Sequence, residues 1–364
     1  MILKMEKEKK KGKLIRNILI FNLLILLTFY LILKDQDFNE LYNAIISVKV
    51  QYILIAVFAM FVYITCEAIN LKRILKVLGK NIGILKGIKY TLIGFFFSSI
   101  TPAASGGQPM EIYCMYKEGI AVSQSTLALL MQLCAFQIVT ISFALFSVTI
   151  NYTLLNKTLI LFFIIGIALN GSALTLLLIG IFSKRLSEGL IKVAIKILKF
   201  FRIKNIEEKQ VKWEKEVQSY QASAIYIKKH KIVMLKTLLT TLVQLMTFYS
   251  VTYWVYCSFG FNKYNIFQVI TIQSVLYAIV SGIPSPGAVG VTEGGFVEIY
   301  KSVFTNGTVS SAMILSRGVS FYLLVIISCL IVVVNSFKIK KNDKFVEVTE
   351  NKMEDLNEKD NSDV

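Results

Sequence analysis

Residues 90–109 read YTLIGFFFSSITPAASGGQP, and residues 266–290 read IFQVITIQSVLYAIVSGIPSPGAVG. In each stretch an apolar run ends abruptly in a segment rich in proline, glycine and serine. Proline and glycine at this density end a helix. Neither stretch therefore predicts one uninterrupted helix. Each predicts two helical pieces separated by a break.

Six other apolar runs are long enough to cross a bilayer, which takes about 20 residues in a helix. Open strands cannot cross lipid, so each run predicts a helix. The composition agrees, because 55% of the residues are hydrophobic and 17% are charged, whereas a soluble domain has about 25% charged residues. The predicted fold class is an all-α integral membrane protein. The predicted spans are 17–33, 52–71, 123–150, 158–182, 232–258 and 309–337.

The basic residues lie in four blocks, at 4–16, 72–89, 184–231 and 338–344. Cytoplasmic loops carry an excess of Lys and Arg, so all four blocks should face the cytoplasm. Eight full spans would place the largest block outside. Six full spans with two re-entrant hairpins place every block inside, together with both chain termini. The hairpin at 88–119 would then enter from the cytoplasm, and the hairpin at 266–304 from outside.

Two broken elements of opposite orientation, about half a chain apart, suggest an inverted repeat. That arrangement is typical of transporters, whose substrate site lies between the halves. A weak internal similarity accompanies it, and it is short enough to be chance. SITP at 99–102 and EIY at 111–113 resemble SGIP at 281–284 and EIY at 298–300.

The chain divides into a basic cytoplasmic N-terminus at 1–16, a transmembrane domain at 17–337 and a polar tail at 338–364 that should be disordered. The basic loop 184–231 interrupts the middle part. Within it, residues 186–201 place lysines against apolar residues, which is typical of a helix in the headgroup layer. A solvated linker helix is the alternative.

Several function classes are excluded by what the chain contains. The net charge of +17 comes from lysines and arginines at the ends of apolar runs, so it indicates membrane topology and anionic lipid, and direct nucleic-acid binding is not expected. Five unpaired cysteines and the single His230 predict no disulfide, no metal site and no histidine-based triad. No G-x-x-x-x-G-K-[ST] loop occurs, so ATP hydrolysis and cofactors are not expected.

Ionisable side chains inside a membrane are costly and mark functional sites. The candidates are Glu67 in the second span, Glu111 after the first break, Glu293 and Glu298 after the second break, and Arg317 in the last span. An arginine can hold a lipid phosphate through two parallel hydrogen bonds. The alternative is an internal pair of Arg317 with one of the last two glutamates. The glutamines in and beside the apolar runs predict interhelical hydrogen bonds, and a hydrophilic lining is the alternative. They are Gln124, Gln132, Gln137, Gln244, Gln268 and Gln273.

The breaks form the second part of the predicted substrate site. Unwound backbone at membrane depth survives only where it is buried in protein or lines a wet cavity. The helix that follows each break offers N–H groups to a phosphate or carboxylate. Ser105, Gln108 and Thr292 should add polar contacts. A purely architectural turn is the alternative. The residues that make the breaks are Pro102, Gly106, Gly107, Pro109, Pro284, Pro286, Gly287 and Gly290.

Residues 101–109, with Tyr113 and Gly119 after them, resemble the first signature of the lysylphosphatidylglycerol synthase transmembrane family. Residues 284–293 resemble its second signature, and Arg317 falls where that family carries an arginine. The resemblance extends from about residue 16 to residue 337. It implies a flippase-like domain, as in bacterial multiple peptide resistance factors. There it is joined to a cytoplasmic domain that transfers lysine from lysyl-tRNA to phosphatidylglycerol, and the product confers resistance to cationic antimicrobial peptides.

The transferase domain should follow the last span and needs a few hundred residues, so the membrane module alone is expected here. The main hypothesis is a lipid translocase of the bacterial inner membrane. It would move an anionic or lysyl-modified phospholipid, or a lipid-linked substrate, between leaflets. The alternatives are a phosphatidylglycerol lysyltransferase, alone or with a separate catalytic partner, and a non-transporting scaffold. The expected partners are membrane phospholipid and a separate aminoacyl- or glycosyltransferase. No sequence feature indicates an oligomeric state.

Overall fold

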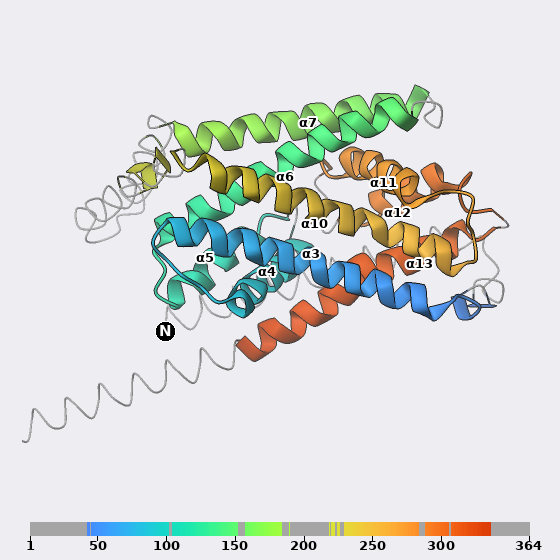
Figure 1. Ribbon diagram of the computed structural model, residues 1–364, viewed down its shortest axis with the longest axis horizontal. Helices are drawn as coiled ribbons and strands as arrows, with labels where there is room; N and C mark the ends of the chain where they lie inside the picture. Colours follow the sequence, from blue (N-terminus) through green and yellow to red (C-terminus); the bar gives the residue numbers. More distant parts are fainter. Residues whose placement is uncertain are drawn as a thin grey trace, which may run out of the picture.

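The computed structural model describes residues 42–43, 45–101, 104–151, 157–183, 189, 218, 220–222, 224–225, 229–283, 288–305 and 307–335. These residues form helices and no strand (Figure 1), which confirms the all-α prediction for this part of the chain. The predicted span at 17–33, the segment 186–201 and the tail 338–364 lie outside the described residues or almost wholly so.

Five helical stretches are long and apolar enough to cross a membrane. They coincide with the five predicted spans from residue 52 onward. Their outer faces carry many exposed large apolar side chains, including Leu54, Leu176 and Leu330, as expected where a helix faces lipid instead of water. The stretches are α3 (Val50–Val77), α6 (Val122–Asn151), α7 (Lys157–Phe182), α10 (Lys231–Ser258) and Val309–Asn335.

The last of these stretches is not a uniform α-helix. It begins as α13 (Val309–Arg317) and continues directly into a π-helical turn, η4 (Gly318–Tyr322), before the α-helical pattern resumes. π-Helical turns are rare and are found frequently at functional sites. Here the turn begins immediately after the arginine that the sequence singles out.

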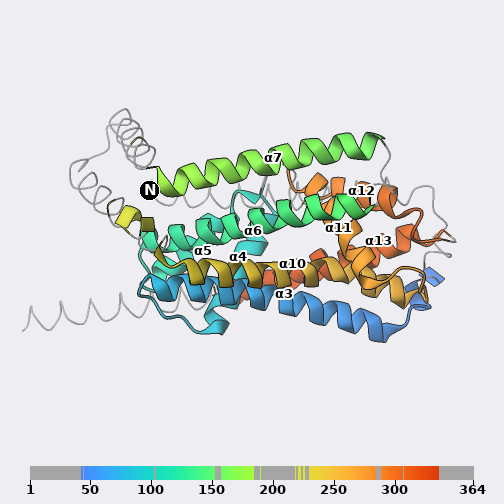
Figure 2. The same cartoon turned by 45° about the horizontal axis from the view of Figure 1, so that its top comes forward.

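Two pairs of shorter helices flank the predicted breaks. α4 (Ile84–Ser99) and α5 (Gly107–Lys117) flank the first, and α11 (Ile266–Val280) and α12 (Val291–Tyr300) flank the second. Each is shorter than the roughly 20 residues that a span requires. Figures 1 and 2 show α4 and α5 at one end of the bundle and α11 and α12 at the other.

Both breaks use the same turn. Ala104 and Ala288 each have φ of 53°, a left-handed conformation that costs an L-residue about 1–2 kcal/mol. Each alanine lies three residues before the helix that follows, which begins at Gly107 or Val291. This correspondence corrects the register of the internal similarity. Glu111 aligns with Gly295, and the EIY match is not at equivalent positions.

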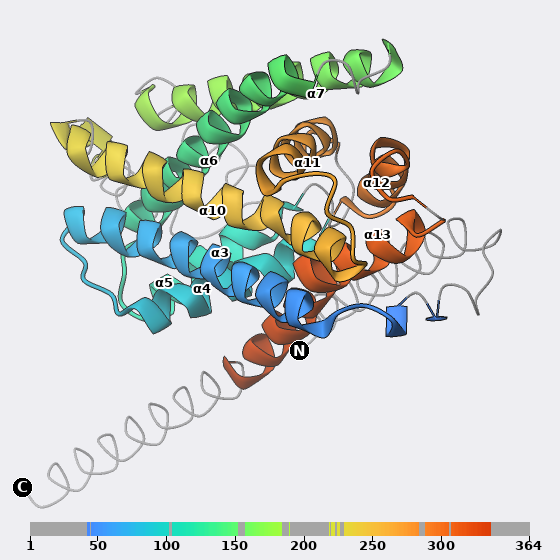
Figure 3. The same cartoon turned by 45° about the vertical axis from the view of Figure 1, so that its right-hand side comes forward.

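The centre of the bundle is the antiparallel pair of α3 and α10, which lie side by side in Figures 1 and 3. Polar groups join them near the C-terminal end of α3. Asn70 donates to Thr241 Oγ1 at 3.0 Å, and Arg73 donates to the Lys236 carbonyl oxygen at 2.9 Å. These bonds fix the position of α3 along α10. α4, α6, α11 and α13 pack against this pair, and α7 packs on α6 and α11.

Candidate functional site

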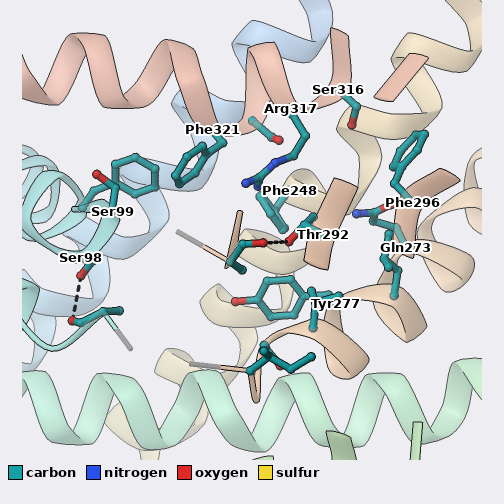
Figure 4. A pocket seen from close by; sticks show the side chains of 18 of the residues that line it. Ser98, Ser99, Phe248, Gln273, Tyr277, Thr292, Phe296, Ser316, Arg317 and Phe321 are labelled. Carbon is teal, nitrogen blue, oxygen red and sulfur yellow. Dashed lines mark hydrogen bonds between the residues drawn. The ribbon is translucent and has the colours of Figure 1, made fainter. Parts of the chain in front are cut away.

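A cavity of about 380 Å³ lies where the two breaks approach each other. We call it the arginine cavity. Ala104 from the first break, Ala288 from the second and Arg317 from the last span all line it. Figure 4 shows the Arg317 side chain directed between Phe321 and Thr292. Two segments far apart in sequence therefore meet at one cavity with a cationic side chain in its wall.

Arg317 is paired with Glu293, which has no exposed surface. The Arg317 Nε–H donates to Glu293 Oε1 at 2.8 Å, and the backbone N–H of Gly290 donates to Oε2 at 2.7 Å. The Tyr322 hydroxyl also donates to Oε1, at 3.3 Å. One carboxylate thus connects the last span to the start of α12, where a negative charge is favourable. The structure shows the internal pair that the sequence left as an alternative.

The pairing does not remove Arg317 from the cavity. Its guanidinium carbon lies 4.3 Å from the centroid of the Phe321 ring, a distance suited to cation–π attraction. A guanidinium presents its N–H donors in a planar fork, and the Nε–H is the donor that bonds to Glu293. The arrangement suits a basic group that is charge-balanced at rest and borders a space where an anion can bind.

A polar network that the sequence did not assign to the site extends from this cavity. Gln273 lines the cavity, and its Oε1 accepts from Thr252 Oγ1 at 3.1 Å and from the Tyr300 hydroxyl at 2.9 Å. Thr252 lies 3.2 Å from the Ser316 hydroxyl, next to Arg317. Gln273 therefore forms the predicted interhelical bonds and also lines the site. Its position within the second broken run was the available signal.

A second cavity, of about 310 Å³, adjoins the first. We call it the carboxyl cavity, because Glu67 from α3 and Glu111 from α5 both line it. Gln244 Nε2 donates to Glu67 Oε2 at 3.3 Å. The two cavities share four wall residues, which are Tyr63, Phe95, Ser98 and Tyr277.

The other predicted polar residues are distributed unevenly. Gln108 lines the carboxyl cavity, and Thr292 lines the arginine cavity. Ser105 is exposed and lines neither. Glu298 is also exposed and forms an ion pair with Lys301 at 2.7 Å, so the structure places it away from Arg317.

The glycines at the breaks permit close approach. A side chain at Gly107 would lie 2.7 Å from the Gly94 carbonyl oxygen, and the N–H of Gly106 donates to Thr101 Oγ1 at 2.9 Å. Gly290 has φ of +89°, which favours glycine. Pro109 lies in the first turn of α5, a position that tolerates proline. Pro102, Pro284, Pro286 and Gly287 lie outside the described residues.

One cluster outside the membrane-spanning segments has a shifted pKa. Glu118 follows α5 and is bonded to Lys89, to Lys86 at 3.1 Å and to the Tyr90 hydroxyl at 2.8 Å. Partial burial by itself would raise the pKa of the Glu118 carboxyl, but these hydrogen bonds and positive charges outweigh it and lower the pKa. The cluster ties α5 to the first turns of α4.

Comparison with known proteins gives one positive finding and one negative finding. A family profile with the description "Lysylphosphatidylglycerol synthase TM region" matches residues 15–328, which is most of the chain. No curated protein matches the chain. The matched range includes both breaks, both cavities and Arg317.

Proposed function

Because this chain belongs to the lysylphosphatidylglycerol synthase transmembrane-region family, we propose that it is a translocase that moves an anionic or lysyl-modified phospholipid between membrane leaflets. The family and the apolar helices together make it a multi-pass membrane protein connected with lysylphosphatidylglycerol metabolism. The observation that carries the proposal is the meeting of both breaks at the arginine cavity. Broken helices at membrane depth are typical of transporter substrate sites.

The helix order supports alternating access by two similar halves. A long helix, a short helix, a break, a short helix and a long helical stretch occur in α3–α4–α5–α6, and the same order recurs in α10, α11, α12 and the stretch Val309–Asn335 that begins with α13. α3 and α10 run antiparallel, and the two breaks approach from opposite ends of the bundle (Figure 1). We therefore interpret the two halves as an inverted repeat with two re-entrant hairpins.

The distribution of lysine favours one orientation. The C-terminal end of α3 and the N-terminal end of α10 lie at the same end of the bundle as α4 and α5 (Figure 1), and that end carries Lys72, Lys76, Lys86, Lys231 and Lys236. The positive-inside rule assigns this end to the cytoplasm. With the span at 17–33, the chain then has six full spans and both termini inside.

The ion pair suggests how Arg317 exchanges one anionic partner for another when lipid binds. An incoming lipid phosphate accepts bonds from the Arg317 guanidinium on the cavity side. Glu293 keeps its bond from the Gly290 N–H and its contact with the Tyr322 hydroxyl when Arg317 turns toward the phosphate. Arg317 therefore has an anionic partner in both states. In the bound state the Glu293 carboxylate retains two hydrogen-bond donors in place of its cation, whereas a buried charge left without any partner is strongly destabilising.

Reconstitution into vesicles tests the proposal. A labelled anionic phospholipid in one leaflet should exchange with wild-type protein, more slowly with Arg317→Lys, which lacks the planar bidentate fork, and at background rate with Arg317→Ala. Glu298→Gln alters a carboxyl on the same helix as Glu293 but on its exposed side, so it should exchange at the normal rate. Normal exchange by a folded Arg317→Ala protein would refute the assignment of the site.

The family description names a synthase, and this favours one alternative. Under it, the chain, alone or with a separate aminoacyltransferase, takes part in transferring lysine to phosphatidylglycerol. Purified protein supplied with lysyl-tRNA and phosphatidylglycerol should make no lysyl lipid if the translocase proposal holds. Synthesis that depends on Arg317 would favour the alternative, because the same site would then bind lipid for chemistry and not for movement.

A further inference from the structure

Several hydrogen-bond acceptors line the carboxyl cavity. Besides Glu67 and Glu111, its wall includes Gln132, which is 9% exposed. Gln132 Nε2 donates to the Glu67 carbonyl oxygen at 3.4 Å, whereas its Oε1 is buried and has no hydrogen-bond partner. An unpartnered buried acceptor beside two carboxyl groups indicates a ligand that donates a proton or carries positive charge.

No described lysine or arginine lies within ion-pair distance of Glu67 or Glu111. The helices α6 and α11, which also line the cavity, contain no Asp, Glu, Lys or Arg. From α4 and α10 the cavity receives the uncharged Thr91 and Gln244. Among the residues that the structure describes, the other titratable side chains in the wall are Tyr63 and Tyr277.

Three cations on or near the surrounding helices have other partners. Arg73 on α3 bonds to Asn70 Oδ1 at 2.7 Å and to the Lys236 carbonyl oxygen. Lys89 on α4 pairs with Glu118 at the end of α5. Arg317, in the adjoining cavity, pairs with Glu293. None of these pairs supplies a positive charge to the carboxyl cavity.

Two carboxylates in the wall of one cavity disfavour carrying a full negative charge at the same time when no cation compensates them. The described part of the chain contains no group of three metal-ligating side chains, so a tightly held metal ion is not the fitting occupant. Glu111 also lies against Gly94, where a Cβ atom would overlap its carboxyl group. This contact holds the Glu111 carboxyl group in the cavity wall, where binding a proton neutralises it without requiring further space.

We propose that Glu67 and Glu111 form a proton-binding site that couples lipid movement to the transmembrane proton gradient. This inference rests on the proposed translocase function. One proton passes from water to a carboxylate oxygen of the pair and leaves as the same O–H bond breaks toward water on the other side. Because the carboxyl cavity shares four wall residues with the arginine cavity, a change of charge in one alters the field and the packing at the other.

The proton site can be tested without any transport. In infrared spectra of the detergent-purified protein, a protonated buried carboxyl gives a carbonyl stretching band near neutral pH. We expect this band in the wild type, its loss or marked reduction in Glu67→Gln and Glu111→Gln, and no change in Glu118→Gln. Glu118 is the matched control because its lysine partners lower its pKa and keep it ionised. Absence of the band in the wild type between pH 5 and 8 would overturn the proposal.

Two additions to the same experiment separate other cations from the proton. If sodium chloride in place of potassium chloride removes the band at constant pH, the site binds an inorganic cation and the proposal is wrong. If a lysyl-modified phospholipid removes it while unmodified phosphatidylglycerol does not, the cavity binds the lipid ammonium group and the proposal is equally wrong. A band that responds to pH and to neither addition supports a proton.

Coupling is tested in vesicles with an imposed pH difference and the membrane potential clamped at zero. One proton per lipid should shift the steady-state ratio of lipid between leaflets by about tenfold for each pH unit. In Glu111→Gln and Glu67→Gln, each a neutral mimic of the protonated state, the ratio of lipid between leaflets should not respond to the gradient. A wild-type ratio that ignores the gradient would overturn coupling. Failure of all lipid exchange would overturn the proposed function too, while the infrared band still decides whether the proton site exists.

Discussion

The Arg317–Glu293 pair should contribute to stability in a way that a double-mutant cycle can isolate. Glu293→Gln leaves a cation in a buried position without its carboxylate, and breaking a buried pair in this way costs about 3–5 kcal/mol. Gln can still accept one of the bonds from Gly290 N–H or Tyr322 OH, so the expected loss lies at the lower end, about 3 kcal/mol. Arg317→Gln should cost a similar amount, because it leaves the buried carboxylate without its cation.

The double variant should cost clearly less than the sum of the two single variants. Once both charges are gone, neither is left alone, and the interaction energy should be about 2–3 kcal/mol. Reversible unfolding in mixed detergent micelles measures all four proteins. Glu298→Gln, in which an exposed pair is lost, should change the free energy of unfolding by less than about 1 kcal/mol. A loss in the double variant equal to the sum of the two single losses would refute the inference that the residues stabilise each other.

Three further outcomes follow from local geometry. Gly94→Ala should lower the melting temperature and displace Glu111, because the new Cβ atom overlaps the Glu111 carboxyl group. Gly171→Ala is the control and should be neutral, because no atom lies within 4 Å of its new Cβ atom. Thermal melts of the two variants measure the difference. Ala288→Gly should raise the free energy of unfolding by up to about 1 kcal/mol by relieving positive φ, measured by the same unfolding assay. Because the pKa of Glu118 is lowered on folding, its stabilisation is full above the unfolded value of about 4.3 and is lost as pH falls through the folded value. The stability difference between wild type and Glu118→Gln should therefore be constant from pH 7 to about pH 5 and shrink as the pH falls below about 4.3.

Hydropathy and charge could predict the long helices, because a span leaves a continuous apolar signal that does not depend on its neighbours. The two breaks were predictable for the same reason, since proline and glycine act locally. The left-handed turns at Ala104 and Ala288 were not. Alanine has no preference for positive φ, so this conformation is imposed by the packing around the breaks.

The site was predictable as a set of residue types and not as a set of contacts. Arg317 was recognisable because an intramembrane arginine is costly, but Glu293 and Glu298 are both acidic residues of α12 and sequence spacing did not choose between them. The structure distinguishes them through the Gly290 N–H, which holds Glu293 inside while Glu298 faces Lys301. The grouping of Glu67 with Glu111 depends on the packing that brings α3 and α5 to the wall of one cavity, and no local sequence pattern predicts it.

Reversible cross-linking across the arginine cavity tests the central claim most directly. On a cysteine-free background, cysteines at positions 104 and 288 place one thiol on each break, and a cleavable bifunctional reagent joins them in vesicles. We predict that lipid exchange between leaflets stops on cross-linking and returns when the reagent is cleaved, while either single cysteine is unaffected. Undiminished exchange by fully cross-linked protein would contradict the account, because lipid would then cross the membrane without using this cavity.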